Sequence, residues 1–88
     1  MQTIGIGVYR KKDYPRIREL STDRVSMDDT WEEWEANKKQ AQKRFEQMGI
    51  HTVDVLVKPT ALAEFCQKHG LHIDGAARSR FVSENTTQ

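Results

Sequence analysis

The chain has 88 residues, of which 36% are hydrophobic and 31% are charged, and its formal net charge at pH 7 is +1. A chain of this length buries one hydrophobic core, which excludes a second domain, and its aromatic and aliphatic content excludes an intrinsically disordered protein. The near-neutral charge also disfavours a dedicated nucleic-acid binder, because such proteins usually carry a clearly basic balance. We therefore expect a single domain over residues 1–84, followed by a disordered polar tail over residues 85–88.

The N-terminal segment and the cysteine content favour a cytoplasmic protein. No basic region precedes the short apolar stretch at residues 3–10, so we expect no signal peptide. No run approaches the roughly 18 apolar residues that a membrane span needs, so we expect no membrane partner. Cys66 is the only cysteine and cannot form the internal disulfide that is typical of secreted scaffolds.

Residues 3–10 have the alternation of a half-buried strand. Ile4, Ile6 and Val8 fall on one side of such a strand. Gly5 and Gly7 fall on the other side, where they leave a flat strip that a helix can approach closely.

A short helix and a polar connection are expected next. Asp13 supplies an acceptor side chain shortly before Pro15, which is typical of a helix start, and the helix should run to about Leu20. Residues 21–29 are predicted to form a polar connection.

The clearest predicted element is a helix over residues 30–48. Thr30 and Glu33 have the spacing of a capping box, and Gly49 can adopt the left-handed conformation that ends a helix. Acidic residues crowd the first half and basic residues follow, which matches the helix dipole. Apolar residues form one stripe at helical spacing, with Lys38 at the only missing position. The members of this stripe are Trp31, Trp34, Ala41, Phe45 and Met48.

Two further helices follow a second strand. Alternating valines predict that strand over residues 50–58, and Pro59 should end it. Thr60 can cap a helix over residues 61–69, which Gly70 would end. Asp74 should open a last short helix. The side chains expected to face inward from the first of these helices are Leu62, Phe65 and Cys66, and the last helix is expected to run through Ala77, Phe81 and Val82.

The order strand, helix, helix, strand, helix, helix predicts an α/β (α+β) fold with a small two-stranded sheet covered by helices. Helical crossovers of this length favour parallel strands. Because a two-stranded sheet is poorly stable alone, either the long helix must cover it or a second subunit must extend it.

No catalytic or metal site is expected. Cys66, His69 and His72 recur at a spacing of three, with His51 or Asp74 as further ligands for a zinc ion. The helix is expected to end between the two histidines, and no second Cys or His pair completes the site. Cys66 and His69 could also pair as a nucleophile and its base, but a free cysteine is more often simply buried. We expect no catalytic residue, no metal and no cofactor.

The leading functional hypothesis is a non-enzymatic protein–protein interaction module, formed as a homodimer or with another protein. Tryptophan is enriched at interfaces, and antiparallel packing of two long helices would place the acidic half of one against the basic half of the other. The candidate interface is formed by Trp31, Trp34, Ala41 and Phe45.

The alternative hypothesis is a nucleic-acid-associated accessory or regulatory protein. Two clusters of basic side chains could hold phosphates, the first of them interleaved with tyrosines. The residues of these clusters are Arg10, Lys11, Lys12, Arg16, Arg78 and Arg80.

The arrangement of several short segments resembles a family of small bacterial proteins with no assigned function. The resemblance covers about Val8 to Val82 and implies a bacterial, cytoplasmic origin, but it transfers no functional residue. The segments are Thr30-Trp31-Glu32-Glu33-Trp34, Gly49 before the valine-rich strand, Phe65-Cys66 ahead of Gly70, and Ala77-Arg78-Ser79-Arg80-Phe81-Val82.

Overall fold

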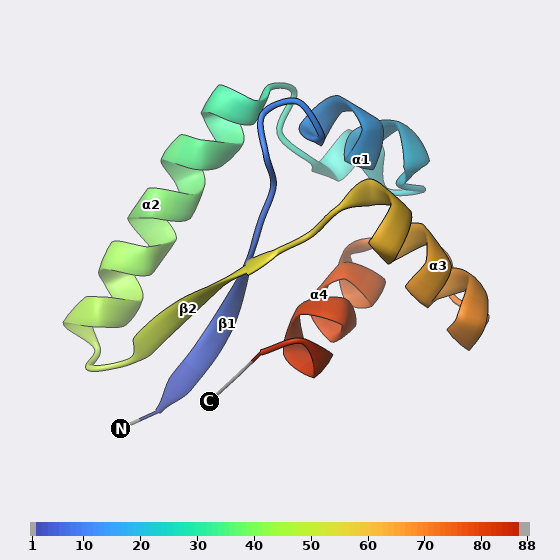
Figure 1. Ribbon diagram of the computed structural model, residues 1–88. Coiled ribbons are helices and arrows are strands. Elements are labelled where there is room, and N and C mark those ends of the chain that lie inside the picture. The colour runs from blue at the N-terminus through green and yellow to red at the C-terminus, as the bar shows by residue number, and fades with distance from the viewer. Residues whose placement is uncertain (1, 87–88) are drawn as a thin grey trace.

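Two parallel strands lie at the centre of the structure, with helices on both sides of them, as the sequence predicts (Figure 1). The computed structural model describes residues 2–86. In chain order the elements are β1 (Thr3–Val8), α1 (Tyr14–Leu20), a short 3₁₀ helix (Arg24–Ser26), α2 (Trp31–Gln47), β2 (His51–Leu56), α3 (Pro59–His69) and α4 (Gly75–Glu84).

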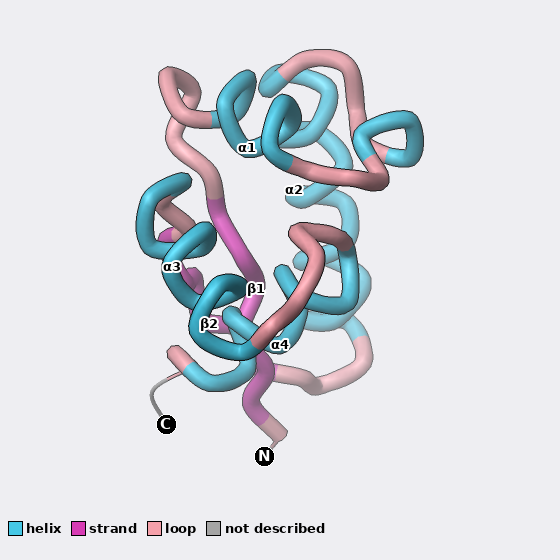
Figure 2. The backbone as a smooth tube through the Cα atoms, turned by 90° about the vertical axis from the view of Figure 1, so that its right-hand side faces the viewer, coloured by secondary structure: helices cyan, strands magenta, loops and turns pink. Residues whose placement is uncertain are grey.

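The register of the two strands assigns each residue to one face of the sheet. Thr3 pairs with His51 and Val8 pairs with Leu56, so that alternate pairs point to opposite faces. On one face the Gln42 side chain of α2 donates to the Asp54 carboxylate at 3.1 Å. Figure 2, turned by 90°, shows α3 and α4 on the near side of the strands and α2 on the far side.

Gly5 and Gly7 lie directly beneath α4. A Cβ atom added to Gly7 would lie 2.9 Å from Cγ2 of Val82, and one added to Gly5 would lie 3.1 Å from the other methyl of Val82 and against the hydroxyl of Thr86. Contacts this short require a neighbour to move. The flat strip predicted from these two glycines is therefore confirmed, and α4 is the helix that occupies it.

The core lies between the sheet and the three shorter helices. Its members are buried side chains from four elements and from the residue after β2, and they are Ile17, Val55, Val57, Leu62, Cys66, Ala77, Phe81 and Val82. The inward-facing residues predicted for the helix that ends before Gly70 are thus confirmed, with Phe65 packed at the margin. In contrast, α2 carries no fully buried residue, and Met48, predicted to belong to its packing stripe, is 70% exposed.

The ends of α2 and α3 follow the sequence in most details. Thr30 Oγ1 accepts a hydrogen bond from the Glu33 amide at 3.1 Å, as the capping-box spacing predicts. Gly49 and Gly70 have φ angles of +77° and +64°, so both adopt the left-handed conformation that suits glycine at a helix end. Leu71 N donates to the Cys66 carbonyl at 2.8 Å and completes the second cap.

Three local predictions are wrong. Thr60 does not cap α3, because Pro59 takes the first helical turn, where its missing N–H costs nothing, and Lys58 precedes it. Asp13 makes no capping hydrogen bond, because its carboxylate pairs with Arg10 instead. The expected polar connection contains the 3₁₀ helix.

The last two described residues cap the C-terminal end of α4. The Asn85 side chain donates to the Phe81 carbonyl at 2.8 Å, and the Thr86 hydroxyl donates to the Val82 carbonyl at 2.7 Å. These two residues belong to the tail expected from the sequence, and the rest of that tail lies outside the described residues. Over residues 2–86, no helix has the length and apolar character needed to cross a bilayer.

Candidate functional site

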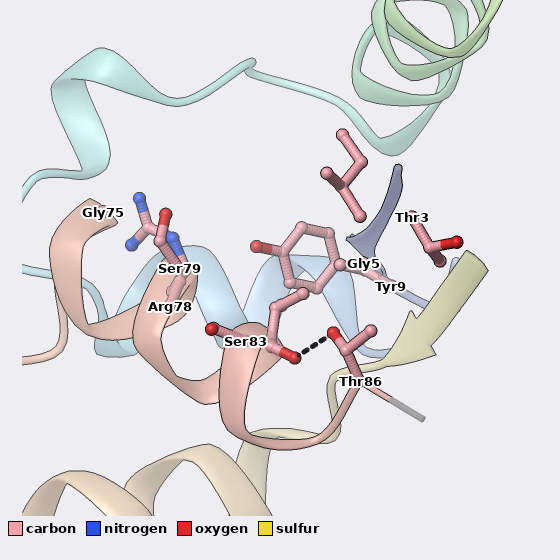
Figure 3. A pocket seen from close by; sticks show the side chains of 11 residues that line it. Thr3, Gly5, Tyr9, Gly75, Arg78, Ser79, Ser83 and Thr86 are labelled. Carbon is pink, nitrogen blue, oxygen red and sulfur yellow. Dashed lines mark hydrogen bonds between the residues drawn. The ribbon is translucent and has the colours of Figure 1, made fainter. Parts of the chain in front are cut away.

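A groove of about 540 Å³ runs between β1 and α4 (Figure 3). Thr3, Gly5 and Gly7 line it from the strand, and Ser79 and Ser83 line it from the helix. Its volume lies in the range typical of ligand-binding pockets, roughly 300–1,000 Å³.

Backbone groups of β1 face this groove. His51 N donates to the Gln2 carbonyl and Val57 N donates to the Val8 carbonyl, both at 2.9 Å. In a parallel ladder, alternate residues of a strand bond to the partner strand. The N–H and C=O groups of the even-numbered residues of β1 therefore point toward β2. The N–H and C=O groups of Thr3, Gly5 and Gly7 point the other way. Within residues 2–86, these outward groups have no backbone partner from another element.

Tyr9 marks the end of this open stretch. Its carbonyl accepts a hydrogen bond from the indole Nε1 of Trp31 at 2.8 Å, so α2 already occupies this point of the edge. Its ring lines the groove, and Figure 3 shows its hydroxyl pointing toward Ser79 and Arg78. Burial raises the pKa of the Tyr9 hydroxyl, and the nearby Arg78 opposes that shift only in part. The hydroxyl is therefore a neutral hydrogen-bonding group at physiological pH.

Four aromatic rings pack together, and one of them, the ring of Tyr9, lines the groove. The Trp34 ring lies 4.9 Å from that of Tyr9, 6.1 Å from that of Tyr14 and 6.3 Å from that of Trp31, measured between centroids. Two of the four interface candidates, Trp31 and Trp34, are thus engaged inside the chain.

The remaining two interface candidates lie further along α2. Ala41 and Phe45 are both half-buried, and α2 packs against β2. The structure therefore places the four candidates on one helix, as predicted, but the aromatic pair and this second pair have different surroundings.

An ion pair anchors the helix wall of the groove. Arg78 donates through Nη1 and Nη2 to the two carboxylate oxygens of Asp23, at 2.9 and 2.8 Å. The same carboxylate accepts from the Gly75 amide at 2.9 Å, at the first residue of α4. These hydrogen bonds, with that from Arg78 foremost, hold the pKa of Asp23 below its usual value.

The basic residues of the alternative hypothesis are mostly paired with carboxylates. Arg10 pairs with Asp13, Lys11 with Glu32, Arg16 with Glu19, Arg78 with Asp23 and Arg80 with Glu84. Lys12 is exposed. Most of the positive charge that was proposed to hold phosphates is therefore balanced locally.

The possible metal ligands and the thiol are not assembled into a site. Cys66 is 2% exposed, and burial raises the pKa of its thiol, which keeps it protonated. The ring of His69 instead packs at a tilt against the ring of Phe65, with 4.6 Å between the ring centroids, and contacts Arg80. Among residues 2–86, no group of three or more His, Cys, Asp or Glu side chains is placed to hold a metal ion.

Comparison of the chain with protein-family models, curated proteins and solved structures finds no match. The groove is therefore identified as the candidate site from its geometry alone. Sequence reasoning identified Gly5 and Gly7 as a surface for a helix but missed the groove beside them. Those glycines were the available clue, because a strand without side chains on one face leaves its backbone accessible.

Proposed function

We propose that this chain is a non-enzymatic protein–protein interaction module that binds its partner in the groove between β1 and α4. The observation that carries the proposal is the row of outward-facing backbone groups at Thr3, Gly5 and Gly7. Strand edges of this kind are ready templates for another chain. From the resemblance and the composition, we further propose a bacterial, cytoplasmic protein.

The chemistry of the groove supports binding rather than catalysis. Its side-chain polar groups are mostly hydroxyls, and its one cation, Arg78, is already paired with Asp23. A nucleophile would need an adjacent base, and the buried Cys66 lies elsewhere, among the core side chains.

Homodimerisation through α2 is the second form of this proposal. The observation that favours it is that none of the 17 residues of α2 is fully buried, although the helix carries an apolar stripe. A second copy could cover Ala41 and Phe45. Sedimentation equilibrium tests this form, and a chain that stays monomeric at high concentration would exclude it.

Nucleic-acid binding remains the alternative proposal, with less support. Phosphate contacts require free cations, and only Lys12 of the six candidates has no carboxylate partner among the ion pairs of the described chain. Retention of nucleic acid at low salt and its loss at high salt would favour this alternative.

The test of the main proposal is affinity capture with a blocked groove. Ser83→Arg places a large side chain in the groove from an exposed helical position. Ala76→Arg, also exposed on α4 but away from this groove, is the matched control. Proteins retained at high salt by the wild type and by Ala76→Arg, but not by Ser83→Arg, would support the proposal. Equal retention by all three variants, or no retained protein, would contradict it.

A further inference from the structure

We propose that the groove binds an extended peptide segment as a third strand, paired with β1 through main-chain hydrogen bonds. This inference rests on the proposed function and specifies the chemistry of the partner. It makes the chain a receptor for an unfolded segment of another protein, in the mode known as β-strand addition.

The length of the open edge defines how much peptide can pair. Thr3 to Gly7 spans about 16 Å of strand, at roughly 3.3 Å for each residue. Its three outward-facing residues each offer one N–H and one C=O, so a paired segment gains about six main-chain hydrogen bonds. Beyond this stretch the Tyr9 carbonyl is already bonded to Trp31, which limits pairing to about five residues.

The opposite edge of the sheet is less suited to strand addition. The corresponding outward positions of β2 are Thr52, Asp54 and Leu56. A charged side chain on an edge strand discourages pairing with another chain, and Asp54 is exposed there. The edge of β1 carries glycines at the equivalent places.

An isolated segment fits this groove better than the β1 strand of a second copy. Because Val82 lies over Gly5 and Gly7, α4 runs above β1 itself. Paired strands lie about 4.8 Å apart, whereas packed helices need roughly 8–10 Å between their axes. Antiparallel pairing of two β1 strands would bring two copies of α4 too close on the same face. A peptide without a helix of its own avoids this clash.

The two faces of the added strand select different side chains. On the α4 side, the peptide meets Ser79 and Ser83, which favour small or polar residues. On the other side it continues the half-exposed row of Ile4 and Ile6, which favours apolar, β-branched residues. Since Arg78 is neutralised by Asp23, no acidic residue is required. The expected ligand is a segment of about five residues with alternating apolar and small or polar side chains.

The experiment uses peptides selected from a displayed library of random heptamers on the intact chain. The tightest peptide is synthesised with a single N-methyl group at each position in turn, because N-methylation removes one main-chain donor. Strand addition predicts that affinity falls at every second position. It also predicts slower amide hydrogen exchange at Gly5 and Gly7 in the complex.

Two variants at one position test the protein side. Thr3→Pro removes an outward-facing N–H at an edge position, where proline is tolerated and the bonds to β2 are kept. Thr3→Val keeps that N–H and is the matched control. Both variants remove the Thr3 hydroxyl, so the difference between them isolates the N–H: loss of one such hydrogen bond should weaken peptide binding by about threefold to tenfold more in Thr3→Pro than in Thr3→Val. Thermal unfolding of both variants checks that the fold is kept, and Ser83→Arg replaces Thr3→Pro if it is not.

The outcomes separate this inference from the function on which it rests. A peptide that is lost with Ser83→Arg but shows no alternation on N-methylation would overturn strand addition and leave the groove as the binding site. Selection of no peptide would overturn strand addition, and the capture experiment would then decide the function separately. Amide exchange at Gly5 and Gly7 is also measured without peptide at increasing protein concentration. Slower exchange at high concentration would identify a second copy as the occupant of the groove and overturn the proposal that a peptide binds there.

Discussion

The guanidinium group of Arg78 donates hydrogen bonds to both carboxylate oxygens of Asp23, at 2.9 and 2.8 Å, across a sequence separation of 55 residues. Arg78 Nη1 also donates to the hydroxyl of Ser21 at 2.9 Å, and Ser21 is completely buried. The Ser21 hydroxyl in turn donates to the carbonyl of Ile17, in α1. This chain of hydrogen bonds ties α1 to α4 and so holds the helix wall of the groove in place.

Arg78→Lys should destabilise the fold although it keeps the charge. A lysine ammonium cannot reproduce the two parallel hydrogen bonds that the planar guanidinium group makes to the Asp23 carboxylate. The Ser21 hydroxyl also loses the hydrogen bond that Arg78 donates to it. We expect the free energy of unfolding in urea to fall by about 2 kcal/mol. Arg80→Lys is the control, because the Arg80–Glu84 pair is exposed and should contribute less than about 0.5 kcal/mol. Equal losses in the two variants would show that the Asp23 contact has no special weight.

Tyr14 should make the fold sensitive to high pH. Its ring is 2% exposed and its hydroxyl donates to the Asp28 carbonyl at 2.6 Å, and burial raises its pKa from 10.0 to about 12. Because the folded pKa is higher than the unfolded one, the neutral hydroxyl contributes its full stability below pH 10, and this contribution is lost as the pH rises towards 12.

The Tyr14→Phe variant isolates this contribution. It should be less stable at neutral pH by about 1 kcal/mol, since the Asp28 carbonyl loses its donor, and it should lose less stability between neutral and alkaline pH. Urea unfolding over a series of alkaline buffers measures both effects. An unchanged alkaline slope would mean that Tyr14 is not the titrating group.

Gly7→Ala should weaken the contact between β1 and α4. The added methyl group would lie 2.9 Å from Val82 Cγ2, and overpacking of this kind costs about 1–3 kcal/mol. The partner variant Val82→Ala removes the obstructing methyl groups, so the double variant should be more stable than the sum of the two single effects predicts. Additive losses in chemical denaturation would show that the two side chains do not meet.

The sequence predicts the helices and strands better than it predicts the contacts between distant segments. Period-two alternation, the capping spacing of Thr30 and Glu33 and the two left-handed glycines are local features, and the structure confirms all three. The Asp23–Arg78 pair depends on two segments meeting in space, and no local pattern marks it.

The groove between β1 and α4 was not predicted from the sequence, for a related reason. Its binding groups are backbone atoms, which every residue carries, so the two glycines indicate an accessible backbone but not which of its N–H and C=O groups are unpaired. Only the register of β1 against β2 shows that the groups of Thr3, Gly5 and Gly7 point outward. Conversely, Trp31 and Trp34 stand out in the sequence, yet their rings pack on Tyr9 and Tyr14 within one chain.

Trp34→Ala distinguishes these two roles of the tryptophans. If Trp34 acts chiefly within the chain, its removal leaves a cavity among three aromatic rings, and the free energy of unfolding should fall by about 3 kcal/mol. That loss should be the same at low and high protein concentration, because no second copy takes part. Met48→Ala is the control, since Met48 belongs to the same predicted stripe but is 70% exposed, and it should change stability by less than about 0.5 kcal/mol. A loss that appears only at concentrations where the wild type self-associates would instead place Trp34 at a dimer interface along α2, because dissociation into monomers then contributes to the measured stability.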